Sequence, residues 1–191
     1  MLKYTGYIRK IRYYSESSHY IVALLEVEED QELLTMNGYM SNFNDYDKYA
    51  FYGDFEIHPK YGQQFKLDHY EIVLSTDEEE IIKYLSSPLF KGIGPTQAKY
   101  IVDALGENAL SLIKEDKHHL DLVKGMTVAK RELIYEVLTS NDYDQEVTQF
   151  FMGHGISLRH IGIIQETYKE KTLEILQNHP YQLVEDIDGI G

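Results

Sequence analysis

The residues best suited to chemistry form a short glycine turn directly before a helix start. Gly92-Ile93-Gly94 permits a tight turn, because glycine adopts positive φ at little cost. Pro95 suits the first helical position, where its missing N–H is not needed, and apolar residues follow at helical spacing from Ala98 to Leu105. The backbone N–H groups of the turn and of the helix N-terminus then converge on one point. The sequence therefore predicts an anion site suited to a phosphate.

The glycine turn recurs in the second half of the chain, which indicates an internal repeat. Gly153-His154-Gly155 aligns with the first turn, while Lys124-Gly125-Met126-Thr127 and Gly189-Ile190-Gly191 add a second turn to each repeat. A helix with a connecting segment is predicted between the two turns of each repeat, at residues 108–121 and 171–184. A repeated turn with its helix is a more specific signal than a single Gly-x-Gly.

This arrangement resembles the helix-hairpin-helix motif, which occurs in pairs in DNA repair and recombination proteins. The motif implies that hairpin amides hold a DNA phosphate without reading sequence, that the aliphatic residue of the turn packs inward, and that a lysine near the helix start adds a charge-assisted contact. The candidate DNA-binding residues are therefore Gly92, Ile93, Gly94, Thr96, Lys99, Gly125, Thr127, Lys130, Gly153 and Gly155. Arg131 is an alternative to Lys130 at the second hairpin.

A purely structural role, in packing or in binding a protein partner, remains the alternative for each hairpin. The turn at Gly125 lacks a second glycine. In the turn at Gly153 and Gly155, polar His154 occupies the apolar position, and Arg159 is the basic residue nearby. The structural alternative is therefore strongest for these two turns.

Residues 1–75 have the pattern of an all-β domain with little helical signal. Five strands are predicted, at residues 2–14, 18–28, 33–40, 48–57 and 63–74. Asn37-Gly38 falls inside the third strand, where it marks either a hairpin turn or a bulge that bends the strand. The count and size favour a five-stranded oligonucleotide-binding (OB) barrel, with an SH3-like barrel as the competitor.

A change in composition near residue 76 marks the end of the barrel. Ser75 or Thr76 is the expected cap of a short helix over 77–85, whose acidic first turn suits a helix N-terminus. All later residues have helical patterns. The predicted fold class is α+β, with an OB-like barrel at 1–75, a helix-hairpin-helix pair at 76–140, and a second repeat at 141–191 that is cut short at its last hairpin.

Composition limits the classes of function. The net charge is −14, and each of the three predicted domains is acidic, so DNA contact has to come from a local patch or from backbone amides and should be weak and salt-sensitive. Without cysteine there is no disulfide and no thiolate metal site. No run of residues has the length and apolarity of a membrane span, and the N-terminus lacks a signal peptide. We expect a cytoplasmic protein without membrane partners.

Residues for catalysis are absent from the sequence. It has no Gly-x-x-x-x-Gly-Lys-Ser/Thr loop for ATP and no cysteine nucleophile. His118-His119 with Asp121, and Glu78-Glu79-Glu80, have the spacing of solvent-exposed helix surface rather than of a metal site. Tyrosine, with 17 residues, is abundant in the barrel region, where aromatic faces either stack on bases or simply suit a half-buried strand.

Three segments carry a resemblance that spans the chain: residues 58–66 (His-Pro-Lys-Tyr-Gly-Gln-Gln-Phe-Lys), 89–95 (Leu-Phe-Lys-Gly-Ile-Gly-Pro) and 178–191 (Asn-His-Pro-Tyr through Asp-Gly-Ile-Gly). In order and spacing they resemble the N-terminal region of bacterial RecD-like ATP-dependent DNA helicases. The resemblance implies a barrel, then tandem helix-hairpin-helix repeats, then a superfamily 1 motor with a Walker ATP site that moves 5′ to 3′ on single-stranded DNA. The motor is missing here, so we expect a fragment of a longer protein.

The expected function is that of a non-catalytic region that binds or guides DNA for such a helicase. No cofactor is expected in the fragment itself, whereas the resemblance implies ATP and Mg²⁺ for the parent protein. Expected partners are single-stranded or forked DNA, the protein's own motor domains, and repair proteins. The alternative is a protein-interaction or structural module that docks on the motor or on a repair partner, since an acidic chain suits basic partners.

Overall fold

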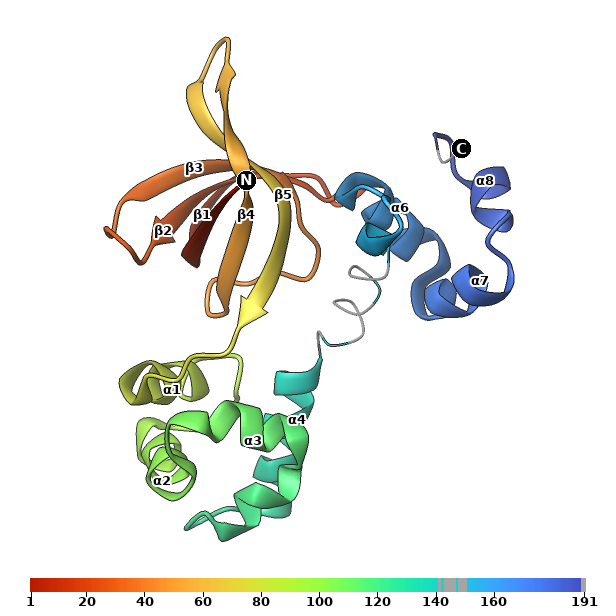
Figure 1. Cartoon of the computed structure of the whole chain (residues 1–191). Coiled ribbons are helices and arrows are strands. Elements are labelled where there is room, and N and C mark those ends of the chain that lie inside the picture. Colours follow the sequence, from red (N-terminus) through yellow and green to blue (C-terminus); the bar gives the residue numbers. More distant parts are fainter. Residues whose placement is uncertain (141, 143–146, 148–150, 190–191) are drawn as a thin grey trace. The chain divides into compact units, whose positions relative to one another are not determined.

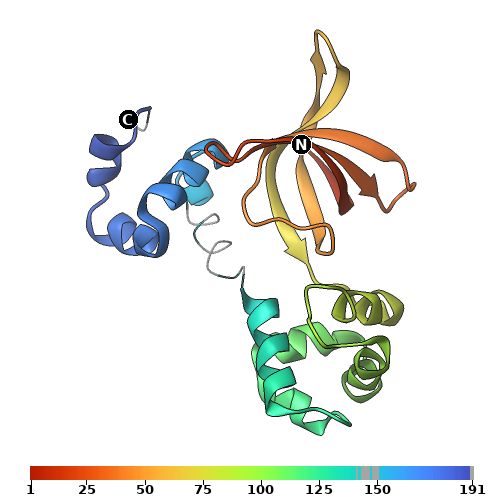
Figure 2. The same cartoon turned by 180° about the vertical axis from the view of Figure 1, so that it is seen from behind.

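The computed structural model describes residues 1–191 except 141, 143–146, 148–150 and 190–191 (Figures 1 and 2). The chain divides into two compact units. The first comprises Met1–Asp45, Tyr49–Glu71 and Tyr143–Gly191, and the second comprises Tyr46–Lys48 and Ile72–Asp142. The domain limits at 75/76 and 140/141 remain a prediction beside this division.

Five strands close into a barrel at the N-terminus. They are β1 (Leu2–Tyr14), β2 (Tyr20–Val27), β3 (Leu33–Tyr39), β4 (Lys48–His58) and β5 (Gly62–Val73). The order around the barrel is β1-β2-β3-β5-β4, with β1 antiparallel to β2 and β4, β2 antiparallel to β3, and β3 parallel to β5. The predicted five-stranded barrel is confirmed, and each predicted strand lies within two residues of the observed bounds.

Side chains of β2 alternate strictly between the barrel interior and the outside. Every second residue from Ile21 to Val27 is buried, because successive side chains of a strand point to opposite faces. The barrel interior also holds one polar pair, in which the Asn37 amide nitrogen donates to Gln64 Oε1 at 2.8 Å. Both side chains are buried, so this hydrogen bond satisfies groups that water cannot reach.

The prediction of a hairpin turn or bulge at Asn37-Gly38 was wrong. Both residues pair regularly with β2 inside β3, opposite Val22 and Ile21. A Cβ atom on Gly38 would lie 2.6 Å from the Cβ of Leu67, so the glycine serves the close approach of β5 rather than a turn. The register shifts lie in β1 instead, between Ile8 and Lys10 and between Ile11 and Tyr13.

The second unit is helical. Its elements are α1 (Glu78–Leu85), α2 (Pro95–Leu105), the 3₁₀ turn η1 (Gly106–Asn108), α3 (Ala109–Glu115), the 3₁₀ segment η2 (Lys117–Leu122) and α4 (Val128–Thr139). Buried residues such as Ile81, Ile101, Ile113 and Ile134 bring one apolar face of each α-helix into a single core.

The cap of α1 differs from the predicted one. Asp77, not Ser75 or Thr76, is the N-cap, and its Oδ1 accepts the backbone N–H of Glu80 at 2.9 Å. The Ser75 hydroxyl donates instead to the Glu80 carboxylate. The acidic run therefore starts one residue earlier than the helix, as the helix dipole favours.

The C-terminal helices of the first unit repeat part of this pattern. α6 (Leu158–Tyr168), η3 (Lys169–Lys171) and α7 (Thr172–Asn178) contain 11, 3 and 7 residues, the same lengths as α2, η1 and α3, and α8 (Gln182–Asp186) follows. The internal repeat predicted from the glycine turns is thus present in the backbone. None of the helices that the structure describes has the length and apolarity needed to cross a membrane.

Candidate nucleic-acid interface

The first hairpin joins α1 to α2 through Gly92-Ile93-Gly94. Gly92 has φ of 85°, a conformation that L side chains rarely adopt. Ile93 is 4% exposed and its N–H donates to the carbonyl of Phe90 at 3.1 Å, so this residue anchors the turn in the core. Gly94 is the N-cap of α2 and offers no side chain to the first-turn amides, while Pro95 stands at the first position. These amides are therefore available to an external acceptor.

The second hairpin has the same backbone but a different cap. Gly125 has φ of 75°, and the N–H of Met126 donates to the carbonyl of Val123 at 3.1 Å. Thr127 caps α4, and its hydroxyl accepts the backbone N–H of Lys130 at 3.2 Å. The Thr127 hydroxyl thus binds one first-turn amide of α4. The equivalent amide of α2 has no such partner, because Gly94 has no side chain.

A glutamine side chain ties these two hairpins together. The Gln97 Nε2 donates to the backbone carbonyl of Lys124 at 3.0 Å, and Lys130 Nζ donates to Gln97 Oε1 at 3.3 Å. The two turns therefore lie side by side in the second unit, and Lys130 faces Gln97. Sequence reasoning missed Gln97, because its partner lies 27 residues away and the helical pattern marks it only as a partly buried polar residue.

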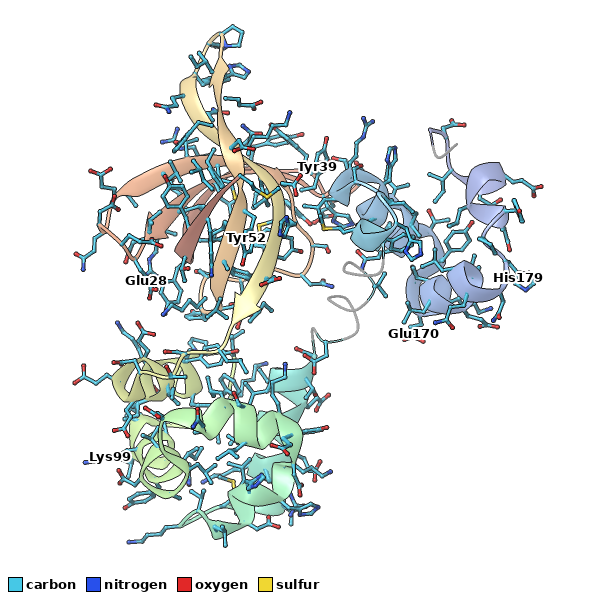
Figure 3. All side chains as sticks on the ribbon, viewed as in Figure 1. Glu28, Tyr39, Tyr52, Lys99, Glu170 and His179 are labelled. Atoms are coloured by element: carbon cyan, nitrogen blue, oxygen red, sulfur yellow. The ribbon has the colours of Figure 1, made fainter. Side chains whose placement is uncertain are left out.

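Cations gather on these two segments. Residues 89–102 and 122–131 contain five basic residues and no aspartate or glutamate, although the whole chain carries a net charge of −14. Lys91, Lys99 and Lys124 are exposed, and Lys124 Nζ lies 5.3 Å from the centre of the Tyr100 ring (Figure 3 labels Lys99). These exposed lysines are the candidates for contact with a polyanion in an otherwise acidic chain.

Arg131 pairs with two carboxylates within the protein, and its assignment as the alternative to Lys130 stays a prediction. Its guanidinium donates to Asp121 at 2.7 Å and to Glu132 at 3.2 Å, and the side chain is 14% exposed. The hydrogen bond from Arg131, with a second from His118, lowers the pKa of Asp121. The hydrogen bond from Lys117, with a second from Arg131, lowers the pKa of Glu132 despite the opposing effect of burial. These ion pairs join the segment η2 to the first turns of α4, next to the second hairpin.

The third hairpin is centred on Gly155. Gly155 has φ of 78°, its N–H donates to the carbonyl of Met152, and the N–H of Ile156 donates to the carbonyl of Phe151, both at 3.0 Å. This pair of hydrogen bonds is the Schellman arrangement that ends a helix at a glycine. Ser157 then stands at the N-cap position of α6, without a side-chain hydrogen bond to the helix amides.

The alignment predicted for this hairpin was therefore displaced by two residues. Gly153 has helical backbone before the turn, so the counterpart of Gly92 is Gly155. Half-buried Ile156 takes the apolar position, and His154 lies exposed outside it. Gly153 is therefore not a residue of the turn, and Gly155 is the turn residue with positive φ.

The fourth hairpin begins at Gly189, whose φ is 88°. Its other two residues, Ile190 and Gly191, lie outside the described residues. A Cβ atom on Gly189 would lie 3.5 Å from His160 Nε2, just as one on Gly125 would lie 3.3 Å from Gln97 Oε1. His160 in α6 thus stands where Gln97 stands in α2.

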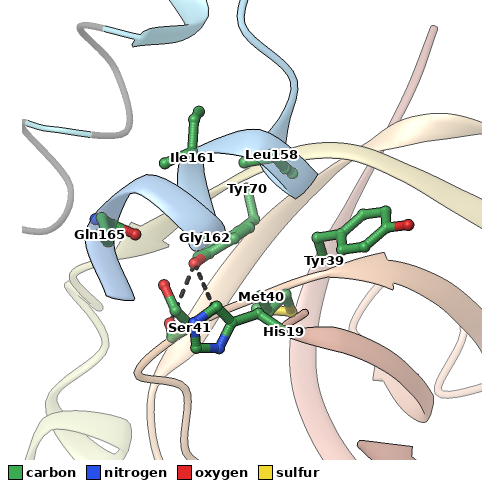
Figure 4. A pocket seen from close by; sticks show the side chains of 9 residues that line it. All are labelled: His19, Tyr39, Met40, Ser41, Tyr70, Leu158, Ile161, Gly162 and Gln165. Atoms are coloured by element: carbon green, nitrogen blue, oxygen red, sulfur yellow. Dashed lines mark hydrogen bonds between the residues drawn. The ribbon is translucent and has the colours of Figure 1, made fainter. Parts of the chain in front are cut away.

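The first unit also contains two hollows. The larger has a volume of about 220 Å³ and is lined by Ile8, Arg9, Lys10, Ile11, Phe43, Asn44 and Asp45. The smaller hollow has a volume of about 10 Å³, room for roughly one water molecule. Tyr70 donates to the carbonyl of Ser41 at its edge (Figure 4). The residues that line it are His19, Tyr39, Met40, Ser41, Tyr70, Leu158, Ile161, Gly162 and Gln165. In the part of the chain that the structure describes, no three His, Cys, Asp or Glu side chains are grouped to hold a metal ion.

The chain combines a closed five-stranded barrel with helices joined by glycine hairpins. Residues 1–75 match the family model for the OB-fold domain of the ATP-dependent DNA helicase YrrC, and residues 140–191 match the model for the HHH domain of ATP-dependent RecD2 DNA helicases. Together with the five-stranded barrel, the two matches support an N-terminal region of a RecD-like helicase. The resemblance and the OB-type barrel inferred from the sequence are confirmed, and both matched domains are accessory domains rather than the motor.

Proposed function

We propose that this chain grips the DNA backbone for a 5′–3′ ATP-dependent helicase, through the paired turns at Gly92 and Gly125. The observation that carries the proposal is the Gln97 link, which holds two turns side by side on segments that are rich in lysine and free of acid. Open amides at the N-terminus of α2 attract a phosphate, and nearby Lys99 and Lys124 add charge. Such contacts position DNA but carry no sequence information.

The proposal extends to the partners and the compartment. Single-stranded or forked DNA is the expected ligand, the helicase motor is the expected neighbour, and repair proteins are further candidates. ATP and Mg²⁺ belong to the motor of the parent protein, because the sequence here contains no Gly-x-x-x-x-Gly-Lys-Ser/Thr loop. A helicase acting on bacterial chromosomal DNA works in the cytoplasm.

Titration of labelled single-stranded, forked and duplex DNA with the chain tests this function. Binding should be independent of base sequence and should weaken by about tenfold or more between roughly 50 and 200 mM salt, because counterions return to the phosphates. The variant Lys99→Glu/Lys124→Glu should lose at least about tenfold in affinity. The matched control is Lys83→Glu, which reverses an exposed lysine on α1 and should retain binding. Equal losses per charge in both variants would contradict the proposal.

A second candidate function is docking on a protein partner. Leu122 and Val128 flank the Gly125 turn and are 79% and 66% exposed, which is unusual for two large aliphatic side chains around one turn. If the chain binds none of the three DNA forms at low salt, this second function replaces the first. Crosslinking of the chain to the purified motor domains would then be expected, and its loss in Leu122→Ser would locate the surface.

A further inference from the structure

Strands β4 and β5 continue past the barrel as a two-stranded ribbon. Pairing of β4 with β1 ends at Gly53, and pairing of β5 with β3 involves Phe65 and Lys66. The residues around the turn between these strands, 57–63, extend beyond the closed part of the barrel, as the yellow hairpin in Figure 1 shows. A two-stranded ribbon adds little stability by itself, so its side chains are free to serve another purpose.

An apolar strip leads from the barrel core to the tip of this ribbon. Phe55 packs edge-on against buried Phe65, with ring centres 5.8 Å apart. Ile57 follows on the same face two residues later and is 83% exposed, and Tyr61 across the turn is 64% exposed. Neither side chain gains stability from burial at this place.

The turn at the tip holds Tyr61 in a defined position. His58 Nδ1 accepts the backbone N–H groups of Lys60 and Tyr61 at 3.1 and 3.2 Å. The rings of His58 and Tyr61 lie 4.8 Å apart, and Lys60 Nζ lies 5.3 Å from the Tyr61 ring centre. The aromatic ring is thus oriented before any ligand arrives, which reduces the entropy lost on binding.

The charge at the tip fits a polyanion. Residues 57–64 include Lys60 and no carboxylate, in a chain with 32 acidic residues. The nearest carboxylate in the sequence, that of Glu56, accepts from Asn37 at 3.0 Å and pairs with Lys66 at 3.6 Å. An exposed aromatic ring beside a lysine is the combination that stacks on a base while the cation approaches the neighbouring phosphate.

We propose that the tip of the β4–β5 ribbon stacks on an unpaired base of single-stranded DNA through Tyr61, with Ile57 as a second apolar contact and Lys60 facing a phosphate. This contact is separate from the backbone grip of the hairpins, because it needs bases rather than phosphates alone. The cation and the absence of carboxylates at the tip favour DNA over a protein partner.

Oligonucleotides with and without bases distinguish the two contacts. For the chain with Tyr61→Ala, affinity for an oligothymidylate should fall about tenfold, the size of one lost stacking contact. Affinity for an abasic strand of the same length should stay unchanged. Lys99→Glu/Lys124→Glu should instead weaken binding of both strands, so failure of the hairpin proposal and failure of this one give different results. Tyr13→Ala, which removes another exposed tyrosine of the barrel, is the matched control.

Fluorescence gives an independent readout, because the chain contains no tryptophan. Tyr61→Trp introduces a single reporter that keeps the stacking surface, so its emission should be quenched by oligothymidylate and not by the abasic strand. Unchanged affinity in Tyr61→Ala, equal loss in Tyr13→Ala, or equal quenching by both strands would each overturn the assignment. Docking of a protein at this tip is the alternative that unchanged DNA affinity would support.

Discussion

The Gln97 side chain donates a 3.0 Å hydrogen bond to the backbone carbonyl of Lys124, and this contact joins the start of α2 to the turn before α4. A side-chain amide is well suited to the task, because it donates to the carbonyl with its nitrogen while its oxygen accepts from Lys130. Gln97 thus links the two turns directly, in addition to the core that they share. His160 takes the equivalent place beside Gly189 in the second repeat.

Replacing Gln97 should loosen the paired turns. Gln97→Ala removes both hydrogen bonds, so we expect a loss of about 1–2 kcal/mol in the free energy of unfolding, measured by urea denaturation. Gln97→Glu can still accept from Lys130 but cannot donate to the Lys124 carbonyl. Its DNA affinity should lie between that of the unmodified chain and that of Gln97→Ala. Gln177→Ala, at an exposed position on α7, is the control and should leave both quantities unchanged.

A pair of glycine substitutions tests the assignment of the third hairpin. Gly155→Ala places a Cβ at φ of 78° and should destabilise the chain by about 1 kcal/mol. Gly153→Ala falls in helical backbone with no atom within 4 Å of the new Cβ, so it should be neutral or stabilising by up to about 1 kcal/mol. If thermal denaturation ranks the two variants the other way, Gly153 is the turn residue after all.

The network behind the second hairpin predicts a loss of stability in acid. Asp121 and Glu132 have pKa values below their ordinary 3.8 and 4.5, because Arg131, His118 and Lys117 hydrogen-bond to the charged forms. Their contribution is therefore present above the ordinary values and is lost as the pH falls through the lowered pKa values, below about pH 4. The melting temperature of Asp121→Asn should fall less steeply over that range than that of the unmodified chain. Parallel curves would show that Asp121 is not coupled to folding.

The raised pKa of Tyr168 predicts a loss of stability at high pH. Burial, together with a 2.6 Å hydrogen bond that its hydroxyl donates to Asp186, raises the pKa of Tyr168 to about 12. The neutral phenol therefore stabilises the folded chain below the ordinary value of 10.0, and this contribution disappears as the pH rises toward 12. Tyr168→Phe should remove the highest-pH step from the ultraviolet titration of the tyrosines. An unaltered last step would assign it to another tyrosine.

The parts of the fold that repeat locally were predictable from the sequence. Strand alternation located all five strands, and the Gly92 turn with Pro95 placed the start of α2 at the correct residue. The third hairpin was misaligned because Gly153 and Gly155 have the spacing of Gly92 and Gly94, and a sequence does not show which glycine has positive φ.

The features that depend on distant parts of the chain could not be predicted. The role of Gln97 requires a partner beyond the local helix, and that of Gly38 requires the approach of Leu67 from β5. The occupation of Arg131 by Asp121 has the same origin, since charge alone made it as good a candidate as Lys130. Tertiary contacts of this kind, including the one between Lys130 and Gln97, are not visible in the sequence.

The acid-free segments around Gly92 and Gly125 have a kinetic consequence. Under the proposed function, a DNA strand is attracted by a few residues and repelled by most others, because the rest of this chain is strongly acidic. Contacts confined in this way should dissociate quickly, with residence times that shorten further as salt rises. Under the proposed function, a region with such short-lived contacts lets a DNA strand move along it rather than holding the strand in one place.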